Sequence, residues 1–264
     1  AMIRSLFLSM QELSKGGNRP AGHPKTEFKK IAVVGAGLMG AGIAYVQAKA
    51  GIPTVLVDVS KENAEKGKDY SRRLVEKAVS RGKSTQEKGD ALLDLITTTD
   101  NYDDVKGADL VIEAVFENVE LKAKITKMAE AVLDKDAVFG SNTSTLPITG
   151  LAEASERPEN FIGIHFFSPV ERMGLVEIIS GEKTSEATLA KAVDYVLAIR
   201  KTPIAVNDSR GFYTSRCFGT YTREGMEMLA EGIKPAIIEN VGRQSGMPMG
   251  PLEVSDSVGL DTAL

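Results

Sequence analysis

Two side chains near the middle of the sequence could act together as a base and its partner. The stretch HFFSPVERMGLVE begins at His165 and ends at Glu177, and both residues adjoin apolar runs. Histidine accepts a proton near neutral pH, and a carboxylate on its second ring nitrogen would fix the tautomer and stabilise the imidazolium. The spacing alone is equally compatible with a packed histidine and an unrelated glutamate. The other histidine, His23, lies in a Pro/Gly-rich stretch.

A glycine pattern nearer the start of the chain could bind the pyrophosphate of a dinucleotide. In GAGLMG, Gly35, Gly37 and Gly40 fit G-x-G-x-x-G. The first permits a tight turn, the second a close approach of backbone to pyrophosphate, and the third close packing of the next helix. Asp58 would bond the ribose hydroxyls and repel a 2′-phosphate, which favours NAD over NADP. A structural turn beside a surface aspartate is the alternative, and the surrounding strand–helix–strand pattern argues against it.

A parallel sheet is needed to bring these residues together. IAVVG at 31–35, a helix from about Leu38 to Ala50 and TVLVD at 54–58 make a βαβ unit. Further apolar runs predict strands at 109–115, 137–142, 161–167, 175–180 and 203–207. Helical periodicity predicts helices at 121–133 and 185–199, and two charged helices between 61 and 95 with a break near Gly82.

The order of these elements predicts an α/β protein. We expect a Rossmann-type NAD-binding domain with a mostly parallel sheet, followed by a truncated all-α domain. Residues 1–24 are expected to form a short helix and a linker, because KGGNRPAGHP is rich in glycine and proline. The NAD-binding domain then spans 25–208. The helical C-terminal domain spans 209–264 and is expected to be incomplete, since only 56 residues follow Asp208.

Composition excludes several other classes of protein. Apolar residues make up 42% and charged residues 26% of the 264, which is ordinary for a soluble protein, and the net charge of −4 argues against a nucleic-acid partner. One cysteine, Cys217, rules out an internal disulfide framework and fits a reducing compartment. No apolar run approaches the length of a membrane span, and no residue cluster has the spacing of metal ligands, so neither a transmembrane segment nor a metal is expected.

Six stretches form a recognisable set: KIAVVGAGLMGAGIA, VLVD, VIEAVFENVELK, SNTSTLPI, HFFSPVERMGLVEII and GMPMGPLEVSDSVGLDTA. Together they closely resemble the L-3-hydroxyacyl-CoA dehydrogenases, and most nearly the dehydrogenase portion of multifunctional fatty-acid oxidation enzymes. The resemblance runs from about Lys30 to the last residue. It implies NAD-dependent oxidation of (S)-3-hydroxyacyl-CoA to 3-ketoacyl-CoA in β-oxidation. It also implies a cytoplasmic location in bacteria, or a mitochondrial or peroxisomal one in eukaryotes.

Before Lys30, the opening helix and linker also look like the segment that joins a preceding enoyl-CoA hydratase domain to the dehydrogenase portion in those enzymes. This chain is therefore expected to be a piece of a longer polypeptide, with a hydratase domain as its partner. Apolar residues of the last helices, such as Met226, Leu229 and Ile233, are expected to remain partly uncovered. We expect self-association through them, most simply as a homodimer.

The resemblance also implies roles for individual residues. His165 matches the catalytic base, Glu177 its carboxylate partner, and Ser144 in SNTS the serine that bonds the substrate's 3-oxygen. Without the resemblance, a strand-end or turn hydroxyl is a plausible interpretation of Ser144. Serines stand where the family often has asparagines that contact cofactor or substrate, at Ser168 and Ser215, and serine lacks the amide's two-sided pairing. The remaining cofactor contacts that the resemblance implies are Met39, Asp58, Val115, Phe116, Glu117 and Lys122.

Several alternatives stay open at this point. The protein could be a dehydrogenase of another 3-hydroxy acid, or a non-catalytic NAD-binding protein on the same fold. Glu117 and Lys122, taken without the resemblance, would be solvated surface charges. The charged helices carry five basic residues: Arg72, Arg73, Lys77, Arg81 and Lys83. The favoured interpretation is a solvated helix face. The resemblance implies instead an arm that lies beside the coenzyme A phosphates.

Overall fold

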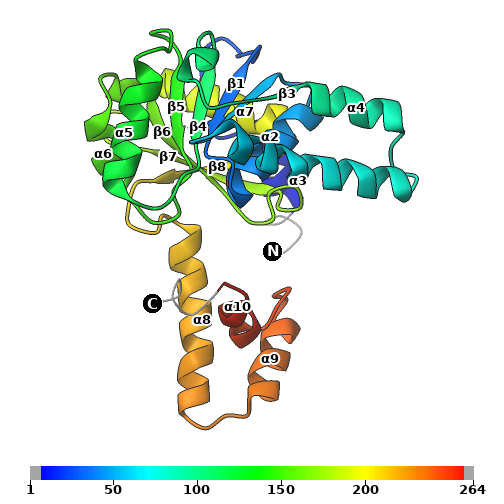
Figure 1. The fold of residues 1–264 in the computed structure, drawn as a ribbon. Helices are drawn as coiled ribbons and strands as arrows, with labels where there is room; N and C mark the ends of the chain where they lie inside the picture. Colours follow the sequence, from blue (N-terminus) through cyan, green and yellow to red (C-terminus); the bar gives the residue numbers. More distant parts are fainter. Residues whose placement is uncertain (1–6, 259–264) are drawn as a thin grey trace. The chain divides into compact units, whose positions relative to one another are not determined.

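A computed structural model of the chain describes residues 7–258. The chain divides into two compact units, the first ending at Arg210 and the second beginning at Gly211. The first unit is built on one eight-stranded sheet with the order β3-β2-β1-β4-β5-β6-β7-β8 (Figure 1). The chain runs outward from β1 through β2 to β3 and then returns to the other side of β1. Open α/β sheets bind ligands at such a reversal point, outside the carboxyl ends of the strands.

The centre of the sheet is parallel and buried on both faces. Every residue of its four apolar central strands is buried, as expected where helices cover both sides. These strands are β1 (Ile31–Val34), β2 (Thr54–Val57), β4 (Leu110–Glu113) and β5 (Val138–Ser141). They confirm the mostly parallel sheet predicted from the apolar runs.

The remaining strands complete both edges of the sheet. β3 (Ile96–Thr99) pairs parallel with β2 at one edge, and its polar sequence, ITTT, lacks the apolar run from which the other strands were predicted. At the other edge, β6 (Phe161–Phe166) is parallel to β5, whereas β7 (Leu175–Ser180) runs antiparallel to β6. β8 (Thr202–Asn207) is parallel to β7. Among the strands that the structure describes, β6 and β7 therefore form the only antiparallel pair.

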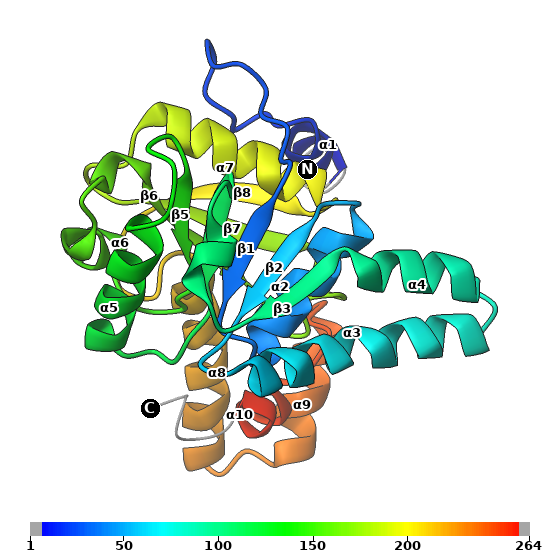
Figure 2. The same ribbon diagram turned by 45° about the horizontal axis from the view of Figure 1, so that its top comes forward.

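In the first unit, helices alternate with the strands along much of the chain. α2 (Leu38–Lys49) is buried along most of its length, because it follows the glycine loop into the core. α3 (Lys61–Ser80) and α4 (Gln86–Asp94) form a hairpin that projects from the sheet (Figures 1 and 2), which confirms the two charged helices expected there. The other α-helices are α5 (Val119–Glu130), α6 (Ile148–Leu151) and α7 (Glu186–Ala198). Short 3₁₀ turns lie at Tyr102–Val105, Ala152–Ala154 and Pro158–Asn160.

The Pro/Gly-rich segment after the first helix is fastened to the sheet domain. α1 (Ser9–Ser14) lies along β8, and the part of the expected opening helix before Phe7 is outside the described residues. The Arg19 guanidinium donates to both Asp194 oxygens at 2.8 and 2.9 Å. It also donates to the carbonyls of Pro20, His23 and Pro24. Composition predicted a linker, but the ion pair between Arg19 and Asp194 holds the segment against α7.

The second unit is helical, as the sequence predicted. Its helices are α8 (Thr214–Ala230), α9 (Pro235–Gln244) and α10 (Pro251–Val258). A Cβ on Gly225 of α8 would lie 2.5 Å from Pro251, so this glycine lets α10 approach closely. The Tyr221 hydroxyl donates to the Met249 carbonyl at 2.8 Å and ties α8 to the turn before α10. Within residues 7–258, no helix has the length and apolar character needed to cross a bilayer.

Candidate active site

The histidine and glutamate that open and close HFFSPVERMGLVE are in direct contact. His165 is the fifth residue of β6, and the antiparallel register sets it opposite Glu177 of β7. Nδ1 of His165 lies 2.7 Å from Oε2 of Glu177, and the two residues are 6% and 0% exposed. An ionised carboxylate can only accept, so the contact places a proton on Nδ1 and leaves Nε2 as the basic nitrogen. This is the geometry of a base held by an orienting group.

The glycine loop is built for a close backbone approach. Gly35 has a φ of +100°, and a Cβ there would lie 2.6 Å from the Ala114 carbonyl. A Cβ on Gly40 would lie 1.7 Å from the Gly35 carbonyl, so both positions need glycine for the fold itself. Gly37, just before α2, is different, because a Cβ there would meet no described atom within 4 Å. The fold leaves that space open, which fits a pyrophosphate at the helix N-terminus.

Asp58 lies beside this loop, directly after β2. Its Oδ2 accepts from the Ala36 N–H at 2.6 Å, and its Oδ1 accepts from the Val59 N–H at 2.8 Å. The carboxylate is therefore tied to the glycine loop, at the carboxyl end of a parallel strand, where the ribose of a dinucleotide binds in such folds. Met39 is half-buried in the first turn of α2, next to the same loop.

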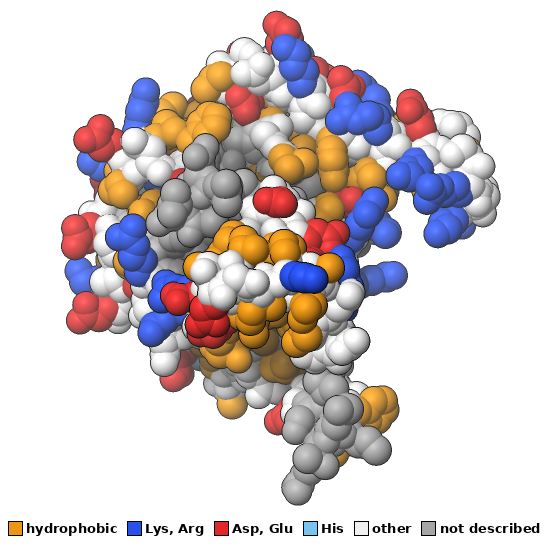
Figure 3. Space-filling view, turned by 90° about the horizontal axis from the view of Figure 1, so that it is seen from below, with side chains coloured by type: hydrophobic (Ala, Val, Ile, Leu, Met, Phe, Trp, Pro, Cys, Tyr) orange, Lys and Arg blue, Asp and Glu red, His pale blue; other side chains and the backbone are white. Residues whose placement is uncertain are grey.

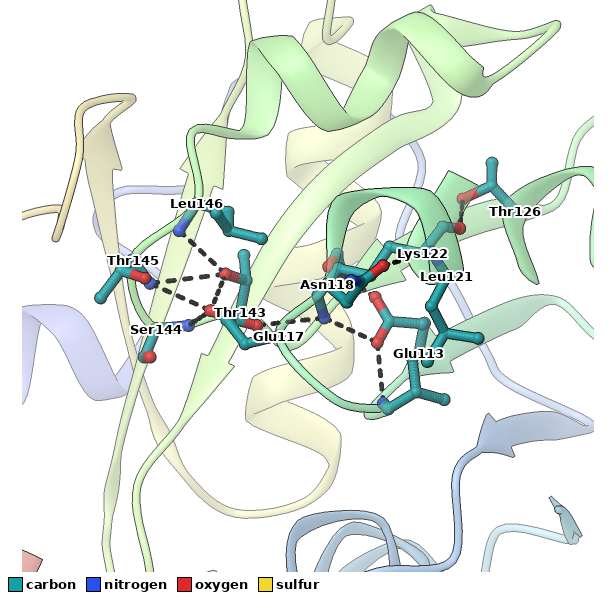
Figure 4. A network of polar contacts seen from close by, with 12 residues as sticks. Glu113, Glu117, Asn118, Leu121, Lys122, Thr126, Thr143, Ser144, Thr145 and Leu146 are labelled. Atoms are coloured by element: carbon teal, nitrogen blue, oxygen red, sulfur yellow. Dashed lines mark hydrogen bonds and ion pairs between the residues drawn. The ribbon is translucent and has the colours of Figure 1, made fainter. Parts of the chain in front are cut away.

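The loop after β4 carries the next group of expected cofactor contacts. Val115 is half-buried, and Phe116 is 86% exposed at the carboxyl end of the sheet. Lys122, on the first turn of α5, is only 2% exposed and lies between two carboxylates. Its Nζ is 2.8 Å from Oε1 of Glu113 and 3.2 Å from Oε2 of Glu117 (Figure 4). The burial of Lys122 excludes its interpretation as a solvated surface charge.

The SNTS turn is held by Glu117. Ser144 is exposed, and its backbone N–H donates to Oε1 of Glu117 at 3.0 Å. The buried Thr143 hydroxyl donates to the same oxygen and accepts from the Leu146 N–H at 3.0 Å. Burial raises the pKa of Glu117, but the Thr143 hydrogen bond and the Lys122 charge outweigh it, so that this pKa is lowered overall. One residue further back, Asn142 accepts from the Phe166 N–H and joins this turn to the strand of His165.

Glu113 is a buried residue of this network that the motifs did not single out. It is 1% exposed at the last position of β4, where it accepts from Lys122 and from the hydroxyl of Ser141. A charged residue inside the apolar run LVIEAV was the available signal, because a carboxylate is buried only where partners compensate for lost hydration.

The two serines that replace family asparagines lie in different units. Ser168 is exposed in the loop after β6, two residues beyond the end of the histidine strand, and a cis peptide bond joins it to Pro169. Ser215 is half-buried near the start of α8 in the second unit. In residues 7–258, no three histidine, cysteine or carboxylate side chains are grouped as metal ligands.

A glycine loop at the reversal point of a Rossmann sheet, with a histidine–carboxylate pair on nearby strands, defines a dinucleotide-dependent dehydrogenase. Residues 30–209 match the NAD-binding domain of 3-hydroxyacyl-CoA dehydrogenase, and residues 211–264 match its C-terminal domain. The chain therefore belongs to the 3-hydroxyacyl-CoA dehydrogenase family. The family resemblance, the Rossmann fold with a helical second part, and NAD as the family's cofactor are thereby confirmed.

Curated relatives and solved structures agree with this assignment. The chain is 41% identical over 260 residues to "Fatty acid oxidation complex subunit alpha" of Shewanella baltica, covering 98% of this chain and 37% of that protein. The corresponding Idiomarina loihiensis protein is 43% identical over 259 residues, with 98% and 36% coverage. The chain thus spans little more than a third of these relatives.

Among solved structures, the (S)-3-hydroxybutyryl-CoA dehydrogenase of Ralstonia eutropha superimposes with a TM-score of 0.87 at 36% identity, over 90% of this chain and 84% of that one. The dehydrogenase part of multifunctional enzyme 1 from C. elegans gives a TM-score of 0.69 at 26% identity, over 91% and 56% of the two chains. A chain named as a dehydrogenase and the dehydrogenase part of a multifunctional enzyme therefore share this fold.

Proposed function

We propose that the protein oxidises (S)-3-hydroxyacyl-CoA to 3-ketoacyl-CoA with NAD, as a step of fatty-acid β-oxidation. The observation that carries the proposal is the buried 2.7 Å contact between His165 and Glu177 in a sheet that also bears the dinucleotide loop. A base is required because the C3 hydroxyl must lose its proton as C3 loses hydride. Family membership supplies the substrate class.

The residues divide the chemistry among them. Nε2 of His165 takes the proton of the C3 hydroxyl, and Glu177 stabilises the imidazolium that forms. The Ser144 hydroxyl bonds the 3-oxygen and holds C3 in place. NAD, when bound, accepts the hydride from C3. The reverse reaction uses the same groups, with the imidazolium returning its proton to the 3-oxygen.

The cofactor is held by the loops at the carboxyl end of the sheet. Gly37 and the N-terminus of α2 receive the pyrophosphate, while Gly35 and Gly40 shape the turn. Asp58 bonds the ribose hydroxyls. Met39 of α2 and Lys122 of α5 contribute further cofactor contacts. The loops after β4, β5 and β6 contribute the others, at Val115, Phe116, Glu117, Ser144 and Ser168.

A second candidate function is reduction of a dicarbonyl compound that carries no coenzyme A. One specific observation favours it: a diketoreductase that acts on dicarbonyl compounds superimposes with a TM-score of 0.83 at 27% identity, over 86% of that chain. NADH oxidation with acetoacetyl-CoA and with free acetoacetate separates the two functions, measured in the natural polypeptide that contains this sequence. We expect turnover of the thioester to exceed that of the acid by at least about 100-fold, because the remote part of the substrate contributes to transition-state binding. Equal turnover would contradict the proposal, and cofactor binding without any turnover would indicate a non-catalytic protein.

We further propose partners and a location. The "Fatty acid oxidation complex" relatives support an acyl-CoA substrate, a hydratase domain in the same polypeptide, and the bacterial cytoplasm as the site of action. Ser215 contributes to substrate binding from α8. Seen from the end of the second unit, apolar side chains gather on its surface (Figure 3), and Leu229, Ile237 and Val241 are 41–52% exposed. The exposure of these apolar side chains supports a homodimer that would cover them, and a monodisperse monomer by sedimentation at micromolar concentration would contradict it.

A further inference from the structure

Glu113 is a buried carboxylate at a junction of three elements, and the proposed reaction leaves it without a role. It ends β4 and is 1% exposed. Its Oε1 accepts from the Val115 N–H and from Nζ of Lys122, each at 2.8 Å. Its Oε2 accepts from the hydroxyl of Ser141, at the end of β5, also at 2.8 Å. This one carboxylate therefore joins β4, β5 and α5 just below the loops that carry the proposed cofactor contacts.

The contact with Lys122 fixes where the ammonium group lies. Lys122 is 2% exposed, and a buried ammonium is held where its charge is compensated. The Glu113 carboxylate compensates the charge of the ammonium, and its own position is fixed by the end of β4. The opposite side of the ammonium lies 3.2 Å from Oε2 of Glu117 on the neighbouring loop. Lys122 is thus a bridge between a rigid strand end and a loop residue.

Glu117 connects Lys122 to the SNTS turn. While its Oε2 faces Lys122, its Oε1 accepts from the hydroxyl of Thr143 and from the N–H groups of Ser144 and Thr145. Figure 4 shows the carboxylate between the ammonium on one side and the turn on the other, with the Ser144 hydroxyl pointing away from it. The backbone of Ser144 is therefore held from beneath while its hydroxyl is presented elsewhere.

We infer that Glu113 is a positioning residue, which sets the place of Ser144 through Lys122 and Glu117. The inference rests on the proposed function, in which the Ser144 hydroxyl bonds the 3-oxygen of the substrate. A displacement of about 1 Å of a positioning group costs on the order of 100-fold in rate, so a carboxylate remote from the substrate can act on turnover. A role in stability alone would leave both the order of the turn and the rate per folded molecule unchanged.

The test compares two glutamine substitutions in the natural polypeptide that contains this sequence. Glu113→Gln keeps the shape of the side chain and removes its charge. Glu130→Gln is the matched control, because Glu130 closes the other end of α5 and holds a different loop, accepting from Ser155 and from the Glu156 N–H. We measure amide hydrogen exchange at Ser144 and Thr145, and kcat and KM for NADH oxidation by acetoacetyl-CoA.

Glu113→Gln should speed exchange at the two amides at least about 10-fold and lower kcat about 10- to 100-fold, with KM changed less than about 3-fold. Glu130→Gln should leave all three quantities within about 3-fold of wild type. In a Lys122→Met background, Glu113→Gln should have no further effect on exchange, because the link it acts through is gone. Unchanged exchange in Glu113→Gln, faster exchange with unchanged kcat, or equal effects of the two glutamine variants would overturn the inference.

A second variant covers the case in which Glu113→Gln does not fold. Ser141→Ala leaves the charge of Glu113 in place and removes one of its hydrogen bonds, so it should change exchange and kcat in the same direction but less. No change in either quantity would again overturn the inference. A wild-type protein without turnover would refute the proposed function and leave the exchange measurement to decide whether Glu113 orders the turn.

Discussion

His165 and Glu177 are twelve residues apart in the chain, yet Nδ1 and Oε2 lie 2.7 Å apart because β6 and β7 pair antiparallel in the register that sets them opposite. Side chains directly opposite on such a pair project from the same face of the sheet. Both residues are buried, so the contact is shielded from water and keeps its electrostatic strength. The hairpin between two core strands thus builds the base and its orienting group as one unit.

Asp58 should make the protein prefer NADH to NADPH. Its carboxylate lies beside the glycine loop, where a 2′-phosphate would meet a like charge. Asp58→Asn keeps an oxygen that can accept from the Ala36 N–H and removes the charge, so it should narrow the preference by about 10-fold or more. Fluorescence titration with both reduced cofactors measures this. Wild-type protein that binds NADPH as tightly as NADH would refute the assignment of Asp58.

Substitution by alanine should affect stability at Gly40 and NADH affinity at Gly37. Gly40→Ala drives a Cβ into the Gly35 carbonyl at 1.7 Å, so it should destabilise the fold by more than about 3 kcal/mol. Gly37→Ala meets open space at a φ of −66°, so its melting temperature should stay within about 2 °C of wild type. Its affinity for NADH should nevertheless fall at least about 10-fold, because the methyl group occupies the proposed pyrophosphate position. A Gly37→Ala protein with normal NADH affinity would show that the loop binds no pyrophosphate there.

The lowered pKa of Glu117 predicts a defined pH dependence of stability. The folded pKa lies below the ordinary value of 4.5, which the unfolded chain keeps. Between these two values the unfolded state binds more protons, so the contribution of Glu117 is complete above about pH 4.5 and is lost as the pH falls through the folded pKa. The melting temperature of wild type should therefore exceed that of Glu117→Gln near pH 6, and the difference should shrink below pH 4.5. A difference that stays constant from about pH 3 to pH 6.5 would mean that the folded pKa is not lowered.

Arg19 should contribute to stability far more than an exposed arginine does. Asp194 is 3% exposed, and without the guanidinium its hydrogen bond from the Thr26 N–H, at 2.9 Å, is the one that stays among the described residues. Arg19→Ala should therefore cost about 3–5 kcal/mol of unfolding free energy, the range for breaking a buried pair. Arg72→Ala is the control, because its contacts with Asp69 and Glu65 are exposed and should contribute less than about 1 kcal/mol. If urea denaturation gave equal losses of unfolding free energy for the two variants, the Arg19–Asp194 pair would contribute no more than an exposed pair.

Apolar periodicity predicted most of the fold, because buried parallel strands and amphipathic helices leave their pattern in the sequence. The strand at 161–167 was expected within one residue of β6, and the helix at 121–133 was displaced from α5 by two or three residues. β3 escaped prediction because ITTT has neither an apolar run nor alternation. Arg19 and Glu113 escaped for another reason: each joins segments far apart in the chain, and such side-chain links have no periodic signature.

The central claim is that His165 is the base, and His165→Gln tests it most directly. The measurement is kcat for NADH oxidation by acetoacetyl-CoA in the natural polypeptide that contains this sequence, together with NADH affinity and a thermal melt. The account predicts a fall in kcat of about 10²- to 10⁴-fold with the fold and NADH affinity retained, and a smaller fall for Glu177→Gln, whose amide can still bond Nδ1 but carries no charge. A His165→Gln protein that melts at a lower temperature but turns over at a near wild-type rate per folded molecule would contradict it, and His165 would then be a packing residue.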